Sequence, residues 1–160
     1  MAVGERLRDR FDARAVFISF AGVTEPARAV AAVGRAVGAD LTGTDLPLRA
    51  VIEHLGDDGW LLILDNLEDV LEVAVDLNAL LEGCPGVAML ATSLTALRLR
   101  AEREYPVLPL PVPGDASAPV AELASSPAVA LFVDRARAVR PDFALTIDNA
   151  AAVAEICRRL

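Results

Sequence analysis

Short apolar runs alternate in this chain with longer stretches in which apolar residues recur at helical spacing. The runs predict β-strands at residues 15–20, 60–65, 87–93 and 105–108. The stretches between the first three predict helices at residues 26–37, 46–55 and 67–81. Because the strands are apolar nearly throughout and alternate with helices, we expect an α/β fold. Its parallel sheet should be covered by helices on both faces and joined by right-handed crossovers.

The helix predicted after the second strand has one apolar face, made of Leu67, Val70, Leu71, Ala74, Leu77, Leu80 and Leu81. Gly83 and Pro85 should end that helix. At the other end of the chain, residues 2–11 predict a charged amphipathic helix, not a signal peptide.

The clearest change of composition is a proline-rich stretch that ends at Gly114. It predicts a linker, and it divides the chain into residues 1–113 and residues 114–160. Two further helices are predicted in the second part, at about residues 128–139 and 149–160. The second part should therefore be a short helical segment.

Composition narrows the partners open to this chain. Its net charge of −8 argues against unspecific nucleic-acid binding, which needs clustered cations to replace the counterions of phosphate. No apolar run reaches the roughly 18–20 residues of a membrane span. Cys84 and Cys157 lack the spacing of a metal site or a disulfide framework. We therefore expect a cytoplasmic protein with two buried thiols, no direct nucleic-acid contact and no membrane contact.

Asp65 is the strongest candidate for chemistry, because it directly follows four apolar residues. A buried parallel strand would deliver its carboxylate at the C-terminal edge of the sheet. Nucleoside-triphosphatases place their Mg²⁺-binding acid, the Walker B element, in this way. The alternative is a structural acid that caps the following helix by accepting backbone N–H bonds.

The phosphate loop that normally accompanies such an acid, G-x-x-x-x-G-K-[ST], is absent from this sequence. All 15 basic residues are arginine, so the chain has no lysine to hold a phosphate. A recognisable part of an ATPase is therefore present without the part that binds the triphosphate.

Further acids follow Asp65 along the predicted helix. Glu68 could orient or deprotonate an attacking water, or it could be an acid favoured by the positive end of the helix. Asp69 and Glu72 share the same helical face and are better explained as acids facing solvent.

Thr92 and Ser93 end the third strand, at the sheet edge where ligands of parallel sheets bind. Their hydroxyls could meet a γ-phosphate or its attacking water, although hydroxyls that merely form a turn are the simpler explanation.

Two other groups of residues have little catalytic promise. His54 is the only histidine and lies on a predicted helix without a nearby nucleophile, so we expect a surface histidine. Arg98, Arg100 and Arg103 form a basic run that should face solvent, although one of them could approach a phosphate.

Four motifs occur in order at residues 62–68 (LILDNLE), 84–87 (CPGV), 90–93 (LATS) and 104–111 (EYPVLPLP). Their order and spacing strongly resemble the STAND class of P-loop NTPases. More narrowly, the sequence is similar to the NB-ARC-type ATPase module of large bacterial transcriptional regulators. Residues 126–136 and 153–160 continue the resemblance, which covers nearly the whole chain.

The resemblance implies ATP and Mg²⁺ binding and a nucleotide-driven switch. Asp65 matches the Walker B acid, and the Thr92–Ser93 pair matches the family's sensor at the next strand. The arginine that usually follows this pair is Leu94 here, which puts γ-phosphate sensing in doubt. Residues 1–113 would be an incomplete P-loop NTPase domain, and residues 114–160 the start of its helical domain.

The family's phosphate loop would precede Met1, and its Gly-x-Pro motif would follow Leu160. In the complete family sheet, the phosphate-loop strand lies between the strands at residues 87–93 and 105–108. Without it, the third strand has an unpaired edge, so we expect self-association, although the sheet could also close on itself.

Two functions follow from these observations. The first is a fragment of the ATP-binding switch of a transcriptional regulator, with the rest of that regulator as partner. Such a fragment would be unable to bind or hydrolyse ATP alone. The alternative is a non-catalytic protein-binding or oligomerisation module derived from this fold. A hydrolase using Asp65 and His54 would require both to meet in one pocket.

Overall fold

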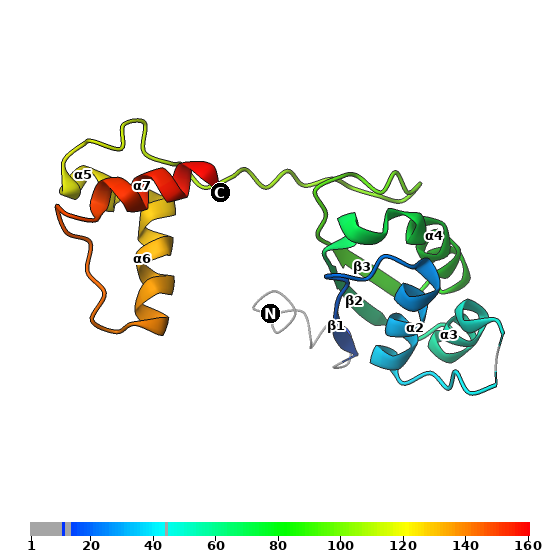
Figure 1. Ribbon diagram of the computed structural model, residues 1–160. Coiled ribbons are helices and arrows are strands. Elements are labelled where there is room, and N and C mark those ends of the chain that lie inside the picture. Colours follow the sequence, from blue (N-terminus) through cyan, green and yellow to red (C-terminus); the bar gives the residue numbers. More distant parts are fainter. Residues whose placement is uncertain (1–10, 12–13, 44) are drawn as a thin grey trace. The chain divides into compact units, whose positions relative to one another are not determined.

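The structure is a computed structural model that describes residue 11, residues 14–43 and residues 45–160. The helix predicted at residues 2–11 therefore lies outside the described residues, apart from Phe11. The chain divides into two compact units, Met1–Glu104 and Tyr105–Leu160 (Figure 1). Each unit is described by itself.

The first unit contains a parallel sheet of three strands in the order β1–β2–β3. Its strands are β1 (Ala15–Ser19), β2 (Trp60–Asp65) and β3 (Val87–Ala91). The register aligns Ser19 with Asp65 at the C-terminal edge of the sheet. The first three predicted strands and their parallel arrangement are thus confirmed.

Four helical segments connect these strands: α2 (Pro26–Val37), α3 (Pro47–Leu55), the 3₁₀ helix η2 (Leu67–Val73) and α4 (Ala74–Gly83). Proline stands at the start of both α2 and α3, where its missing N–H costs no helical bond. Gly38 ends α2 in the left-handed conformation, with φ 84°, which favours glycine.

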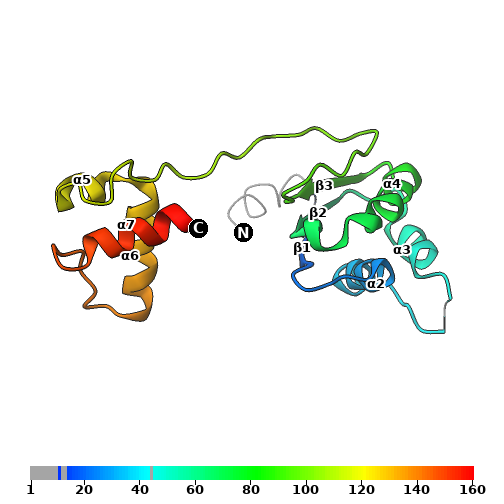
Figure 2. The ribbon, with the colours of Figure 1, turned by 45° about the horizontal axis from the view of Figure 1, so that its top comes forward.

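One hydrophobic core joins the helices to a single face of the sheet. The strand order follows the chain in one direction, so right-handed crossovers bring α2, α3 and α4 to the same side (Figures 1 and 2). The strands contribute to this core through Ile18, Leu62, Leu64 and Val87.

The opposite face of the sheet is more open. Phe17, Ile63 and Leu90 form one row across it, and the side chains of Phe17 and Leu90 are 49% and 41% exposed. Ile63 is half-buried and does not belong to the core. Leu61, on the same face, is only 3% exposed. The described crossover helices thus cover one face, and helices over the other face stay a prediction.

The helix predicted after β2 is interrupted. Val70, in the middle of η2, has φ −144° and ψ 49°, which lies outside the helical region, so the helical path is broken within η2 before α4 begins. The interruption turns Val73 into the core, where it is fully buried, and leaves Leu71 36% exposed. A continuous helical face at residues 67–81 is thus wrong at Leu71.

The second unit contains three helices, α5 (Val120–Ser125), α6 (Pro127–Val139) and α7 (Ala150–Arg159). The two longer helices confirm the prediction, whereas α5 was not expected from the sequence. Small clusters hold them together: Leu123 packs with Ala150 and Ala154, and Val129 packs with Val153 and Cys157.

The fourth strand predicted at residues 105–108 is wrong. These residues form neither helix nor strand, and the Tyr105 side chain is 87% exposed. Their composition favours a strand, but no other strand of the described residues pairs with them, and Pro106 has no N–H to offer. The division of the chain falls after Glu104, nine residues before the expected division after residue 113.

Candidate functional site

Asp65 is the last residue of β2, the central strand, and a threonine from the neighbouring strand end holds its carboxylate. The Thr92 hydroxyl donates to Asp65 Oδ1 at 2.6 Å and accepts the Asn66 N–H at 3.1 Å. The Thr92 backbone N–H donates to Leu64 O at 2.8 Å, and its carbonyl accepts the Leu67 N–H at 3.1 Å. Four hydrogen bonds therefore fasten Thr92 to the corner that follows β2.

The corner itself depends on Asn66, which adopts the left-handed conformation with φ 61°. Asparagine tolerates this conformation better than most residues do. No side-chain hydrogen bond caps the start of η2. The alternative in which Asp65 caps the following helix is therefore wrong, and its carboxylate turns to Thr92 instead.

Glu68 lies one step beyond this corner. Its Oε1 accepts a hydrogen bond from Asn66 Nδ2 at 3.2 Å, whereas its Oε2 is buried and has no hydrogen-bond partner among the described residues. A buried carboxylate oxygen without a donor is costly, so such an oxygen commonly has a partner that the protein alone does not supply. Asn66 links Glu68 to the same corner as Asp65.

Asp65 and Glu68 do not make a complete metal site. In the part of the chain that the structure describes, no three His, Cys, Asp or Glu side chains are arranged to hold a metal ion. Mg²⁺ is usually bound by one or two protein carboxylates, with water and substrate phosphates completing the shell. The residues present therefore fit a metal that arrives with a phosphate, and do not fit a resident metal.

Ser93 and Leu94 follow Thr92 at the sheet edge. Ser93 Oγ accepts the Thr95 N–H at 3.1 Å, the geometry of a hydroxyl that forms a turn. Leu94 is 89% exposed. The Thr92 hydroxyl proton is directed at Asp65, so in this structure Thr92 orients the acid. Contact of either hydroxyl with a nucleotide stays a prediction.

The sequence did not predict two features of this sheet edge. Ser19 ends β1 directly beside Asp65 in the sheet register. Asp69 Oδ2 accepts the Gly22 N–H at 3.1 Å, which ties the loop after β1 to η2. Asp69 was visible as an acid, but its partner lies 47 positions away and no local pattern indicates it. Glu72 is exposed, as expected.

His54 belongs to the opposite end of the sheet. Its Nε2 lies 3.0 Å from the Val37 carbonyl oxygen, and its ring centroid lies 6.4 Å from that of Trp60. Trp60 begins β2 and Asp65 ends it, a separation of about 16 Å at ~3.3 Å per residue. A hydrolase that uses Asp65 and His54 together is therefore ruled out, and His54 links α3 to the end of α2.

The remaining candidates have structural explanations. Arg98, Arg100 and Arg103 are exposed, as predicted. Cys84 and Cys157 are free, buried thiols, which confirms that expectation. Burial raises the pKa of both thiols, and for Cys84 the charge of Asp57 adds to the rise, so neither is a reactive nucleophile.

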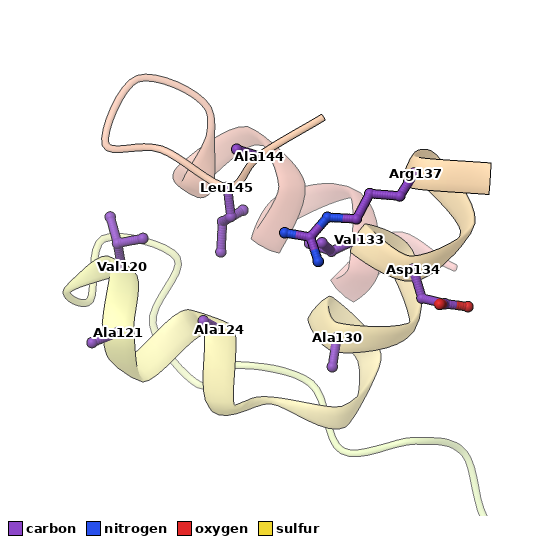
Figure 3. A pocket seen from close by; sticks show the side chains of 9 residues that line it. All are labelled: Val120, Ala121, Ala124, Ala130, Val133, Asp134, Arg137, Ala144 and Leu145. Atoms are coloured by element: carbon purple, nitrogen blue, oxygen red, sulfur yellow. The ribbon is translucent and has the colours of Figure 1, made fainter. Parts of the chain in front are cut away.

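The second unit has a shallow hollow of about 690 Å³ between α5, α6 and the loop before α7 (Figure 3). Ala121, Ala124, Ala130 and Leu145 give it an apolar lining. The Arg137 guanidinium reaches over it while Nε donates to the Phe143 carbonyl oxygen at 3.1 Å. One cation above small apolar side chains does not form a reactive group, so we assign no chemistry to this hollow.

None of the helices that the structure describes is long and apolar enough to cross a membrane. No family model and no solved structure matches the chain.

Mycobacterial proteins are similar to the chain. It is 39% identical over 114 residues to an uncharacterized protein of Mycobacterium tuberculosis, across 71% of the chain and 26% of that relative. An uncharacterized protein of Mycobacterium bovis matches equally well. The chain is also 35% identical over 149 residues to a Mycobacterium tuberculosis protein provisionally named an HTH-type transcriptional regulator. That match covers 90% of the chain.

The chain spans about a quarter of the uncharacterized relatives and 15% of the one named as a regulator. The region of this chain that aligns with the named regulator includes most of both units. These similarities support a regulator-related role.

Proposed function

We propose that this chain is the Walker B part of an ATP-dependent switch in a bacterial transcriptional regulator, and that it neither binds nor hydrolyses ATP alone. The observation that carries the proposal is Asp65 at the C-terminal end of the central strand, with its carboxylate oriented by the Thr92 hydroxyl at 2.6 Å. Ligands of parallel sheets bind at this edge. Similarity to a protein named as a transcriptional regulator supports the setting.

Each residue of the edge has a role in this proposal. Asp65 would hold Mg²⁺, directly or through water, since a hard cation prefers oxygen ligands. Glu68 would orient the attacking water through the buried Oε2, which lacks a partner among the described residues. Thr92 would keep Asp65 in position, and Ser93 would lie near the terminal phosphate.

The element that this chain lacks is the phosphate-binding loop. Most phosphate contacts in such sites come from the backbone of a glycine-rich loop and from its lysine, and this sequence contains neither. One carboxylate pair and a few hydroxyls do not offset the desolvation of a triphosphate. ATP and Mg²⁺ would therefore bind only to a longer regulator of cytoplasmic location, in which the rest of the protein supplies that loop.

Calorimetric titration of ATP–Mg²⁺ tests this proposal in two proteins. The chain itself should give no binding at about 100 μM, a concentration at which ligands with Kd near or below 100 μM are detected. A longer version, carrying an upstream phosphate loop of the same gene, should bind. In that longer version, Asp65→Asn should abolish the Mg²⁺-dependent part of binding, while the matched change Asp69→Asn should preserve it.

Two results would count against the proposal. Low-micromolar ATP binding by the chain alone would show that it is not an incomplete site. A longer version that carries the phosphate loop and still ignores ATP would favour the second candidate, a non-catalytic protein-binding or oligomerisation module. Among the described residues, β3 pairs with a strand on one side only, and this supports that candidate, because unpaired strand edges are templates for association.

A further inference from the structure

The two acids of the candidate site, Asp65 and Glu68, are each held through one carboxylate oxygen. Asp65 Oδ1 accepts the Thr92 hydroxyl at 2.6 Å, and Glu68 Oε1 accepts Asn66 Nδ2 at 3.2 Å. The second oxygen of each acid accepts no hydrogen bond from the described residues. Because one oxygen is held, the direction of the other is fixed as well.

A continuous series of hydrogen bonds connects the two acids through Asn66. The Asn66 backbone N–H donates to the Thr92 hydroxyl oxygen at 3.1 Å, and that hydroxyl donates to Asp65. The Asn66 side chain donates to Glu68 on the other side. Asn66 therefore binds toward Asp65 with its backbone and toward Glu68 with its side chain.

The position of Asn66 requires two properties at once. Its φ of 61° lies in the left-handed region, which asparagine, aspartate and glycine tolerate better than most residues do. Glycine has no side chain, however, and an ionised aspartate has no N–H to donate. Asparagine combines this backbone conformation with a donor for Glu68.

The bond from Asn66 determines which oxygen of Glu68 is left for a further partner. Glu68 is half-buried, and its Oε2 is buried without a hydrogen-bond partner among the described residues. A water molecule is the smallest group that can donate to such an oxygen. Since Oε1 already has its donor, a water that binds Glu68 is directed to Oε2.

We propose that Asn66 is a positioning residue for ATP hydrolysis: it holds Glu68 through Oε1 and so leaves Oε2 to orient the attacking water. The inference rests on the proposed function, which supplies Mg²⁺ and ATP at Asp65. Asn66 touches neither the nucleotide nor the water. It affects the rate of hydrolysis through Glu68, while Thr92 and Asp65 determine metal binding.

Asn66→Gly isolates the side-chain bond. Glycine keeps the left-handed conformation and the backbone N–H that donates to Thr92, and it removes only the donor to Glu68. The matched control is Asn78→Ala in α4. Asn78 Nδ2 also donates to a glutamate, Glu82 Oε1 at 2.9 Å, but this pair lies outside the corner that carries Asp65.

The assay compares ATP hydrolysis and calorimetric ATP–Mg²⁺ binding in the longer version that carries the phosphate loop. A positioned acid or base contributes roughly 10²–10⁴-fold to a rate, so Asn66→Gly should lower kcat by about 10-fold or more. Its ATP–Mg²⁺ affinity should be unchanged, because Asp65 keeps its bond from Thr92. Asn78→Ala should keep both kcat and affinity.

Three results of this assay would overturn the inference. An unchanged kcat in Asn66→Gly would show that Glu68 needs no such support. A loss of ATP affinity as large as the loss of kcat would show that Asn66 merely maintains the corner. A longer version that binds no ATP even when unaltered would overturn the proposed function together with the inference, and calorimetry distinguishes that case from the other two.

Exchanging the two side chains tests the hydrogen bond in this chain without any nucleotide. Asn66→Asp keeps the left-handed conformation but places a second carboxylate beside Glu68, so the urea midpoint followed by Trp60 fluorescence should fall. Adding Glu68→Gln supplies an amide donor and reverses the bond, so the double variant should regain most of the loss. A double variant no more stable than Asn66→Asp would overturn the inference.

Discussion

Replacing Thr92 by valine tests whether its hydroxyl holds the corner that carries Asp65. Valine keeps the shape of threonine and removes two hydrogen bonds, one to Asp65 Oδ1 at 2.6 Å and one from Asn66 N at 3.1 Å. A bond to a charged group contributes roughly 1.5–3 kcal/mol and a neutral one roughly 0.5–1.5 kcal/mol. Because Thr92 is exposed, the low ends apply, and we expect a loss of about 2 kcal/mol.

The assay is urea unfolding followed by the fluorescence of Trp60, the only tryptophan, which reports on the first unit alone. In thermal unfolding followed by the same fluorescence, a loss of about 2 kcal/mol should lower the Tm of this unit by about 8 °C or more. Thr92→Ser keeps the hydroxyl and should stay within about 0.5 kcal/mol of the unaltered chain.

Ser93→Ala is the matched control at the next position. It removes only the turn bond from Thr95 N, which water can replace at this exposed site, so its effect should also stay within about 0.5 kcal/mol. The reasoning would be refuted if Thr92→Val unfolded like the unaltered chain. Equal destabilisation by Thr92→Ser and Thr92→Val would refute it too, because the hydroxyl would then be irrelevant.

Other variants test the packing and the ionisation of the fold. Gly86→Ala places a Cβ 2.5 Å from a backbone oxygen and should cost about 3 kcal/mol in urea unfolding, whereas Gly83→Ala meets only a movable side chain at 3.0 Å and should cost less than about 1 kcal/mol. Burial raises the pKa of the Cys84 thiol. The neutral thiol therefore contributes its full stabilisation of the fold below the ordinary thiol pKa near 9, and this stabilisation is lost as the pH rises further. The unfolding free energy should therefore fall above pH 9, and fall less in Cys84→Ala; an equal fall in both proteins would contradict this. The Gly22 N–H donates to Asp69 Oδ2 at 3.1 Å, so Asp69→Ala should speed hydrogen exchange at the Gly22 amide. Unchanged exchange there would show that this hydrogen bond is not formed in solution.

The sequence predicted the first three strands closely, for a physical reason. Each places apolar residues in one shared core, so the pattern that marks the strand is also what buries it. The segment at residues 105–108 has an equally favourable composition and still forms no strand. A strand needs an edge to pair with, and composition carries no information about which edges are free.

The candidate site was predictable in position but not in detail. An acid that directly follows a buried strand must lie at the end of that strand, so the location of Asp65 followed from local sequence. The bond from Thr92 requires the register of β2 against β3, and the bond between Asp69 and Gly22 spans 47 positions. The interruption at Val70 was hidden for a similar reason, since tertiary packing and not helical periodicity determines it.

The strand order β1–β2–β3 means that each strand in the described part of the chain pairs only with its neighbours in sequence. The contacts that stabilise each crossover are therefore local along the chain, as in repeat proteins that stack one unit on the next. Such an architecture can lose or gain a unit at either edge without rearranging the others. Insertions and deletions at the sheet edges should accordingly be the changes that a family built on this arrangement accumulates most readily.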